Sequence, residues 1–313
     1  MNIFLTLLIS SSLSWWITKL LIKPFKKLIP DLPNERSAHN QIKPRGGGIS
    51  FISINFLLAI IFNQNNFVFL LPLSLISILD DFFNVSRSLR FITQILTACY
   101  LLFFSPYFEL IMQIDYIALR IIVFTLIVFG SAAIINFCNF MDGIDGILTG
   151  SILIILISFS LLISGNIWPL IGSLFGFLCW NWKPSKIFMG DIGSNFLGGV
   201  LVWTILNTEN IKYSFGLILI ASPILVDPLI CLIRRFIQNQ NIFKAHSLHL
   251  YQRLNKGGLD HAQISIIYIL SSLGISIAFF LGGLFYGIFI AMCIYTFGFW
   301  LDKSKAIPFF EKS

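Results

Sequence analysis

Long apolar segments alternate with short polar segments along almost the whole chain. Most apolar segments approach the ~20 residues that an α-helix needs to cross a bilayer, and turn residues or charges end each one. The pattern therefore predicts about eleven transmembrane helices. Very short connections are expected at 63–66, at 164–166 and at the Gly282–Gly283 pair. The expected helices are 2–22, 48–63, 67–79, 91–105, 116–137, 147–163, 167–180, 193–207, 213–234, 262–281 and 283–301.

Composition favours an all-α, polytopic integral membrane protein. Of the 313 residues, 57% are hydrophobic and 11% are charged, whereas a soluble domain has about 25% charged residues. Apolar segments fill nearly the whole sequence, so we expect a single transmembrane domain over residues 1–313. The first segment lacks the basic start and the cleavage site of a signal peptide, so we expect it to be retained as a span. The expected helices 67–79 and 193–207 are short, and they must extend into their flanks or lie in a thinner region of the bilayer.

The distribution of basic residues predicts the orientation. If successive connections alternate in side, nearly all of the 21 Lys and Arg residues lie on one side, and the exceptions are Lys19, Arg120 and Lys212. Because basic residues mark the cytoplasmic side, we expect the N-terminus outside and the C-terminus in the cytoplasm. The net charge of +7 then reports topology, and no basic run with interleaved aromatic residues favours nucleic acid as a partner. We expect an active site built from the cytoplasmic segments 23–47, 80–90, 136–146, 181–192 and 235–261.

Aspartates concentrate in these cytoplasmic segments. Asp142, Asp145 and Asp191 open expected helices, where capping of free N–H groups is the alternative explanation for each one alone. Asp80 and Asp81 end an expected helix, where the helix dipole disfavours negative charge, so capping does not explain them. Carboxylates this concentrated repel one another unless a cation joins them. The cluster therefore predicts a hard divalent ion, Mg²⁺ with Mn²⁺ as a substitute, bound together with substrate phosphates.

Small and amide-bearing residues accompany the acids. Backbone N–H groups that precede a helix are candidates for binding a phosphate, and an adjacent guanidinium adds a contact; a flexible entry into the helix is the alternative. These candidates are Arg45, Gly46, Gly47 and Gly48. Asn136 and Asn139 are candidates for orienting a sugar amide or a carboxylate, although a helix-end role accounts equally well for Asn136.

Two histidines, His246 and His249, lie on one face if the stretch AHSLHLYQ is helical. They lack thiolate or carboxylate neighbours at the spacing typical of zinc sites, so zinc is not expected. With Arg253 and Lys244 nearby in the sequence, the pair is a candidate for binding a diphosphate. A solvated basic loop is the alternative.

Asp227 lies within an expected span, where an acid is by default a functional candidate. A local ion pair with Arg234, about two helical turns away, is the explanation we favour. His39 and His261 have no comparable context and are expected to be ordinary surface residues. The five cysteines are scattered and are expected to be small, buried apolar residues.

The ordered segments DLPNERSAH and PRGGG, DD, NFCNFMDGIDG, FMGDIGSNFLG and AHSLHLYQ resemble the polyprenyl-phosphate N-acetylhexosamine-1-phosphate transferase family (glycosyltransferase family 4). The resemblance covers about residues 31 to 253, and N-x-x-N-x-x-D-G-x-D-G followed by M-G-D-x-G-S is its most specific part. It implies an enzyme of the bacterial cytoplasmic membrane that uses Mg²⁺. Such an enzyme moves a sugar 1-phosphate from a UDP-N-acetylhexosamine to undecaprenyl phosphate and releases UMP. A homodimer is compatible with the resemblance.

The same resemblance implies a role for each motif. Asp80 and Asp81 look like the family's aspartate pair, with Asp80 as the candidate to deprotonate the lipid phosphate, to align it or to attack as a covalent nucleophile. Asp191 looks like the metal ligand. Asn139, Asp142 and Asp145 look like the family's nucleotide- and metal-proximal motif. His246 and His249 look like its histidine motif.

Within the family, ERSAH and AHSLHLYQ look closer to the group that initiates O-antigen synthesis than to the peptidoglycan phospho-N-acetylmuramoyl-pentapeptide transferase, which is the alternative. Ser247 and Leu248 depart from the Arg and Ser that this group commonly carries, and Lys244 is the candidate to replace the missing cation. N-acetylglucosamine, N-acetylfucosamine and N-acetylquinovosamine are all compatible with the sequence. A transporter or ion pathway is the rival class, but it would place its acids deep within spans, as only Asp227 is placed here.

Overall fold

The computed structural model describes residues 2–33, 41–61, 67–83, 85–163, 167–242, 244 and 246–309. Its elements are almost entirely helical, as the hydropathy pattern predicted. A short 3-10 helix, η1 (Val68–Leu70), precedes α3, and β1 (Pro30–Asp31) pairs antiparallel with β2 (Lys43–Pro44). His39 and the expected connections 63–66 and 164–166 lie outside the described residues. The helices are α1 (Ile3–Leu28), α2 (Gly48–Ile61), α3 (Leu71–Phe83), α4 (Arg87–Phe103), α5 (Pro106–Met112), α6 (Ile117–Met141), α7 (Ile147–Leu162), α8 (Trp168–Asn181), α9 (Gly190–Leu206), α10 (Ile211–Ile237), α11 (Leu250–Lys256) and α12 (His261–Ser304).

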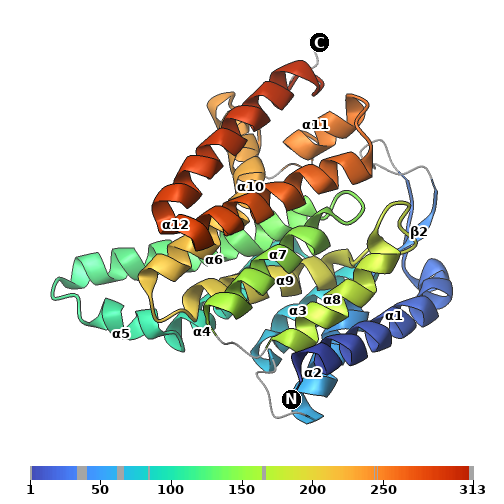
Figure 1. Ribbon diagram of the computed structural model, residues 1–313, viewed down its shortest axis with the longest axis horizontal. Helices are drawn as coiled ribbons and strands as arrows, with labels where there is room; N and C mark the ends of the chain where they lie inside the picture. Colours follow the sequence, from blue (N-terminus) through green and yellow to red (C-terminus); the bar gives the residue numbers. More distant parts are fainter. Residues whose placement is uncertain are drawn as a thin grey trace.

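Helix α9 lies in the middle of the bundle (Figure 1), where it packs against α2, α3, α4, α6, α7 and α10. Every residue of α9 is buried except Asp191 and Trp203. A helix without a polar face suits this position because every side meets another helix. Its glycines allow the close approach, since a Cβ at Gly198 would lie 2.7 Å from the Cα of Ile135. The fold thus places Asp191 at the N-terminal end of its most enclosed helix.

Helices α1 and α8 pack closely through small side chains. The buried residues of α1 recur every turn, and a Cβ at Gly176 of α8 would lie only 2.1 Å from the carbonyl oxygen of Ser11. The Trp180 indole Nε1–H also donates to the Trp15 carbonyl at 3.0 Å. Such close approach of small residues is a common way for helices to associate where apolar surface alone does not distinguish partners. The buried residues of α1 are Thr6, Ser10, Ser14, Thr18 and Phe25.

The last helix, α12, bends where the sequence predicted a break between two segments. Gly282 and Gly283 have non-helical backbone angles, and Gly283 has a φ of 67°. Only glycine adopts this region readily, so the Gly–Gly pair ends one limb of the helix and starts the next. The two limbs form the bent red element of Figure 1.

Several of the described helices could cross a membrane by length and composition. Helices α1, α6, α10 and α12 qualify individually, and the pair α4 and α5, which bends by 81°, qualifies if it forms one span. Helices α2, α7 and α9 are shorter but apolar. The two short expected helices do extend into their flanks, because η1 continues into α3 as far as Phe83 and α9 begins at Gly190.

Helix α5, helix α11 and the β1–β2 ribbon were not expected. Helix α5 begins with Pro106 directly after Ser105, which is a helix-start signal too short for a hydropathy pattern to register. The ribbon pairs Pro30 with Pro44 and Asp31 with Lys43. Two-residue strands carry no readable alternation of polar and apolar positions.

Candidate functional site

Asp81 links the end of α3 to the start of α9. Its carboxylate accepts hydrogen bonds from the backbone N–H groups of Asp191 at 3.1 Å and Ile192 at 3.2 Å. Asp81 is 7% exposed. We expected that helix capping could not explain Asp81. This expectation is correct for α3, the helix that Asp81 belongs to, but not for α9. The carboxylate caps α9 instead, where the free N–H groups and the helix dipole favour negative charge.

Arg90 joins Asp80 to Asp191. One guanidinium nitrogen, Nη1, forms an ion pair with Asp80 and lies 2.8 Å from Asp191 Oδ2. The other oxygen of Asp80 accepts a hydrogen bond from the N–H of Val85 at 2.8 Å. Ser86 caps α4 by accepting from the N–H of Leu89, which places Arg90 in the first turn of that helix. A cation is unfavourable there, so the two carboxylates compensate the helix dipole as well as the guanidinium charge.

Arg90 was not predicted as a site residue, although it lies within the expected segment 80–90. Its signal was weak because a single Arg shortly after an acidic pair is common on a solvated surface. In the fold it is the cation in contact with both the predicted catalytic aspartate and the predicted metal ligand.

Asp142 ends α6, and its backbone N–H donates to the Asn139 carbonyl at 3.3 Å. Burial raises the pKa of this carboxyl well above its ordinary value, and the neighbouring carboxylates of Asp191 and Asp81 raise it further. The three acids are therefore close enough to oppose each other's ionisation. A cation among them would reverse that effect.

Asp145 belongs to a second polar cluster. Its side chain accepts from the Ser185 hydroxyl at 2.7 Å and from the Ser185 N–H at 3.1 Å, and Lys43 Nζ lies 3.6 Å away. His261 Nδ1 lies 3.4 Å from the same carboxylate. Burial opposes ionisation of Asp145, but the hydrogen bonds from His261 and Ser185 and the charge of Lys43 outweigh it and lower the pKa. The expectation that His261 is an ordinary surface residue was wrong, because it is 9% exposed and contacts Asp145.

The glycines before α2 serve close packing. The N–H groups of Gly47 and Gly48 donate to the carbonyls of Phe188 and Met189, both at 2.9 Å. A Cβ at Gly48 would lie 2.5 Å from the Cα of Gly193 in α9. For Gly47 and Gly48, the expected role as phosphate-binding N–H groups is therefore corrected, since these donors already have backbone partners.

For Gly46 and Arg45, phosphate binding stays a prediction. Gly46 has a φ of 81°, which lets the chain turn from β2 into α2. The Arg45 N–H donates to the Ile29 carbonyl at 3.0 Å, and its side-chain Nε lies 4.0 Å from Asp31 Oδ1. The guanidinium is partly exposed beside the site.

Asn136 takes part in an amide network between helices. Its Nδ2 donates to Gln94 Oε1 at 2.6 Å, and Gln94 Nε2 lies 3.4 Å from Asn195 Oδ1. Asn195 in turn donates to the Ser77 hydroxyl at 3.0 Å. This network ties α3, α4, α6 and α9 together beneath the acids.

Asn139 connects α6 to the first turns of α9. Its Nδ2 donates to the hydroxyl oxygen of Ser194 at 3.2 Å, and that hydroxyl donates to the Gly190 carbonyl at 3.2 Å. Asn139 thus helps to fix the turn that carries Asp191. Contact of either asparagine with a substrate stays a prediction.

His246 and His249 lie together before α11, with ring centroids 4.9 Å apart. His249 is 4% exposed and stacks between Phe140 and Tyr251, whereas His246 is half-buried. Burial lowers the pKa of His246 to about 4 and also lowers that of His249, so both rings are neutral at pH 7. Their predicted contact with a diphosphate stays a prediction.

Of the two cations that we expected around these histidines, Arg253 is used elsewhere, and the role of the Lys244 side chain stays a prediction. Arg253 is buried and pairs with Asp302, and its Nη1 donates to the Ile307 carbonyl at 2.8 Å. The Lys244 carbonyl accepts from Arg235 at 3.0 Å. A different lysine, Lys256 of α11, donates to the Ser247 hydroxyl at 2.7 Å. A cation therefore does reach the position where the sequence departs from the family pattern.

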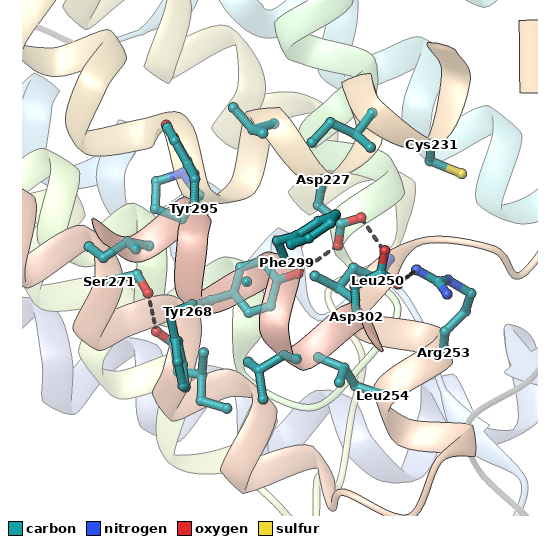
Figure 2. A pocket seen from close by; sticks show the side chains of 18 of the residues that line it. Asp227, Cys231, Leu250, Arg253, Leu254, Tyr268, Ser271, Tyr295, Phe299 and Asp302 are labelled. Carbon is teal, nitrogen blue, oxygen red and sulfur yellow. Dashed lines mark hydrogen bonds and ion pairs between the residues drawn. The ribbon is translucent and has the colours of Figure 1, made fainter. Parts of the chain in front are cut away.

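A cavity of about 150 Å³ lies between α10, α11 and α12 (Figure 2). Asp227 lines it and accepts hydrogen bonds from the N–H groups of Leu250 at 2.7 Å and Tyr251 at 3.2 Å, and from the Tyr268 hydroxyl at 2.6 Å. The expected ion pair between Asp227 and Arg234 was wrong, because Arg234 lies 2.6 Å from Asp302 instead. Asp227 holds the start of α11 through the same capping physics that Asp81 uses at α9.

Comparison with known proteins places the chain in a family. Residues 64–209 match the family model for glycosyl transferase family 4. A probable undecaprenyl-phosphate N-acetylglucosaminyl 1-phosphate transferase of Bacillus subtilis (strain 168) is 30% identical over 290 residues, which cover 81% of this chain and 79% of that protein. The chain belongs to glycosyl transferase family 4.

Two further relatives are similar over most of their length. An undecaprenyl-phosphate alpha-N-acetylglucosaminyl 1-phosphate transferase of Thermotoga maritima is 29% identical over 293 residues, which cover 90% of this chain and 92% of that protein. A phospho-N-acetylmuramoyl-pentapeptide-transferase of Staphylococcus carnosus (strain TM300) is 29% identical over 263 residues, with coverage of 72% and 81%. The names of the relatives of this chain thus include different sugar donors.

The acidic cluster of this family member fits a hard divalent cation. Asp80, Asp142 and Asp191 offer carboxylate oxygens, which are the ligands that Mg²⁺ and Mn²⁺ prefer. Burial is the main cause of the raised pKa of Asp142, and the nearby carboxylates of Asp191 and Asp81 add to it, as expected where acids share a site. Arg90 now balances part of that charge.

Proposed function

We propose that the protein transfers N-acetylglucosamine 1-phosphate from UDP-N-acetylglucosamine to undecaprenyl phosphate, with release of UMP. The observation that carries the proposal is the meeting of Asp80, Asp81 and Asp191 at the joined ends of α3 and α9, with Arg90 between two of the carboxylates. The names of the two relatives that align over 81% and 90% of this chain support the N-acetylglucosamine donor. The relative named for the muramoyl-pentapeptide donor aligns over 72%.

The proposal includes a membrane orientation. About eleven spans, with the N-terminus outside and the C-terminus inside, place the acidic cluster at the cytoplasmic face of the inner membrane. This position suits the two substrates, because the polyprenyl chain of the acceptor stays in the bilayer while its phosphate meets a water-soluble nucleotide. The product is a sugar linked to undecaprenyl diphosphate, which is the starting unit for O-antigen or another cell-envelope polysaccharide.

In the proposed reaction, an oxygen of the lipid phosphate attacks the β-phosphorus of the UDP-sugar. A new P–O bond forms there, the bond to the UMP oxygen breaks, and UMP leaves with that bond's electron pair. A phosphate monoester has a second pKa of about 6, so the acceptor is already largely dianionic at neutral pH. Asp80 therefore aligns the acceptor and takes its last proton when one is present.

Catalysis of such a transfer rests on positioning and on charge compensation. Asp81 acts as a positioning residue, because its hydrogen bonds to the first turn of α9 set the place of Asp191. Arg90 turns from the carboxylates toward the phosphates when these bind, and it compensates charge on the oxygens in transfer. Asn139 supports the same turn of α9 through Ser194.

Asp191, together with Asp142, would hold Mg²⁺. When bound, the ion supplies charge compensation for the diphosphate and for the departing UMP. The protein side chains contribute positioning, since they exclude competing orientations of the two phosphate groups.

The test is a transfer assay with purified protein in detergent or nanodiscs. Undecaprenyl phosphate, Mg²⁺ and UDP-N-acetylglucosamine should yield UMP and a lipid-linked sugar in equal amounts, whereas UDP-N-acetylmuramoyl-pentapeptide should not. Asp80→Asn and Asp191→Asn should each abolish UMP release while membrane expression stays intact. Near-wild-type turnover in either variant would remove the role assigned to that residue, and turnover of the pentapeptide substrate alone would replace the proposed donor.

A further inference from the structure

Helix α1 carries four lysines on one side, which we call the lysine face. The cytoplasmic segment was expected to begin at residue 23, but α1 continues as a helix to Leu28. The basic residues near its end are therefore in register with Lys19. Spacings of three and four residues put side chains on the same face of a helix. The lysine face consists of Lys19, Lys23, Lys26 and Lys27.

The lysine face is turned away from the bundle. All four lysines are exposed, whereas the buried residues of α1, from Thr6 to Phe25, recur on the opposite side of the helix. Helix α1 packs mainly against α8 and α2 and lies at the edge of the bundle (Figure 1). The lysine face is therefore open to the surrounding membrane.

The length of α1 indicates how deep the lysines lie. At ~1.5 Å per residue, the ~30 Å hydrocarbon core of a bilayer takes up about 20 helical residues. A span that begins near Ile3 thus leaves Lys23 and the residues after it in the headgroup layer. Lys19 lies one turn deeper, and its long aliphatic stem lets the ammonium group reach the same layer. In the proposed orientation this layer belongs to the cytoplasmic leaflet.

Two tryptophans orient Lys19. Its Nζ lies 5.2 Å from the ring centroid of Trp15 and 5.7 Å from that of Trp16. Trp15 also packs on Trp180 of α8, with ring centroids 5.1 Å apart. Tryptophan is enriched at the boundary between hydrocarbon and headgroups, which agrees with the depth inferred from the helix length. An ammonium group has three N–H donors, so Lys19 can meet both rings and still donate to an anion.

No acidic side chain compensates the lysine face. Helix α1 contains no Asp or Glu, and neither do α2 and α8, the helices that pack against it. Among the described residues, no carboxylate forms an ion pair with any of the four lysines. Asp31, the next acid along the described chain, lies near Arg45 instead. The helix dipole accounts for the two lysines of the last turn, but not for Lys19 and Lys23.

We propose that the lysine face binds the headgroup of an anionic phospholipid, such as phosphatidylglycerol, in the cytoplasmic leaflet. Clusters of four or more basic residues at the cytoplasmic end of a span are typical of binding to anionic headgroups. The lipid phosphate lies between Lys19 and Lys23, and the acyl chains run toward the bilayer centre along the exposed side chains of Trp16 and Leu13. The bound lipid supplies the negative charge that the neighbouring helices lack.

The test is lipid titration of the full-length protein in detergent, followed by native mass spectrometry. Phosphatidylglycerol and phosphatidylcholine with the same acyl chains are compared. The wild type should bind phosphatidylglycerol at least tenfold more tightly. Lys19→Gln and Lys23→Gln should each weaken this binding about fivefold, the share of one basic residue near a membrane surface. Added salt should weaken it further, because the contact is between charges.

Lys303→Gln is the matched control. Lys303 is also exposed near the end of a helix, and its Nζ lies 4.4 Å from the ring centroid of Phe299. It follows Asp302 directly and lies on α12, outside the lysine face. This variant should bind phosphatidylglycerol like the wild type.

Three results would overturn the proposal. The first is equal binding of the two phospholipids by the wild type, a comparison that needs no variant. The second is equal affinity of Lys19→Gln and Lys303→Gln for phosphatidylglycerol. The third is displacement of phosphatidylglycerol by undecaprenyl phosphate at a lower concentration, which would assign the lysine face to the proposed acceptor. The inference uses the proposed orientation but not the transfer reaction, so UMP release tests the proposed function separately.

Discussion

The carboxylate of Asp81 accepts a hydrogen bond from the backbone N–H of Asp191 at 3.1 Å. One acid of the cluster therefore sets the position of another through the first turn of α9. This contact explains how an acidic pair at the end of one helix and a single Asp in a distant segment form one site. It also distinguishes Asp81, which positions Asp191, from the residues that are proposed to contact the substrate.

Replacement of Asp81 tests that positioning role. Asp81→Ala removes the cap of α9, which should cost about 1–2 kcal/mol of stability and should lower UMP release at least tenfold. Asp81→Asn keeps one acceptor oxygen and should recover most of the stability. The apparent Mg²⁺ affinity, measured by titrating activity, should weaken in both variants because Asp191 is displaced. Loss of stability with unchanged Mg²⁺ dependence would reduce Asp81 to a structural residue.

Arg90 makes a distinct prediction. Hydrogen bonds to charged groups contribute about 1.5–3 kcal/mol, so Arg90→Ala should lower UMP release about tenfold to a hundredfold. Binding of Mn²⁺ in the absence of substrate, followed by electron paramagnetic resonance, should instead tighten because a competing cation is gone. Arg90→Lys retains the positive charge but not the guanidinium that contacts both Asp80 and Asp191. Its rate of UMP release should therefore fall between those of the wild type and Arg90→Ala. Weaker ion binding in Arg90→Ala would contradict this account.

Asp145 gives a pH-dependent prediction. Its pKa is lowered in the folded protein, so its stabilising effect is complete above the unfolded-state value of about 3.9 and is lost as the pH falls below it. Removal of one partner from a buried ion pair costs about 3–5 kcal/mol, so Asp145→Asn should unfold at a clearly lower temperature at pH 7.

The measurement is thermal unfolding of both proteins in detergent from pH 7 to pH 3. The gap between wild type and Asp145→Asn should be constant down to about pH 4 and should then shrink. His261→Gln should show a smaller loss, since Ser185 and Lys43 still contact the carboxylate. A gap that widens on acidification would show that the carboxylate is not the stabilising form.

Gly48 offers a test of packing with a matched control. A Cβ at this position would lie 2.5 Å from Gly193 Cα and 2.7 Å from Gly193 N, so α2 and α9 would have to move apart. Gly48→Ala should therefore cost about 1–3 kcal/mol or more and should reduce the folded yield. Gly130→Ala is the control, because no atom lies within 4 Å of its Cβ position; it should be neutral or slightly stabilising. Equal behaviour of the two variants would argue against close packing at Gly48.

The sequence predicted the helices well because hydropathy over ~20 residues is a strong signal. It also predicted the break at Gly282–Gly283, since two adjacent glycines interrupt an otherwise continuous apolar run. It failed for α5 and α11, which are seven residues each. Helices this short depend on caps and tertiary contacts, as the hydrogen bonds from Leu250 and Tyr251 to Asp227 illustrate.

Individual roles at the site were harder to predict than the acidic residues themselves. Arg90 and His261 gained meaning only when the fold brought them to Asp191 and Asp145. Gly47 and Gly48 were assigned to phosphate binding because the sequence does not reveal that α9 lies against them.

The contact of α1 with α8 has a consequence for biosynthesis. Trp15 and Trp180 are 165 positions apart, and a ribosome adds roughly 5–20 residues per second. The first helix therefore waits on the order of ten to thirty seconds before its partner emerges. During that time the face of α1 that packs against α8 in the fold stays uncovered. The nascent chain consequently meets quality-control proteases with this face of α1 uncovered until α8 is made.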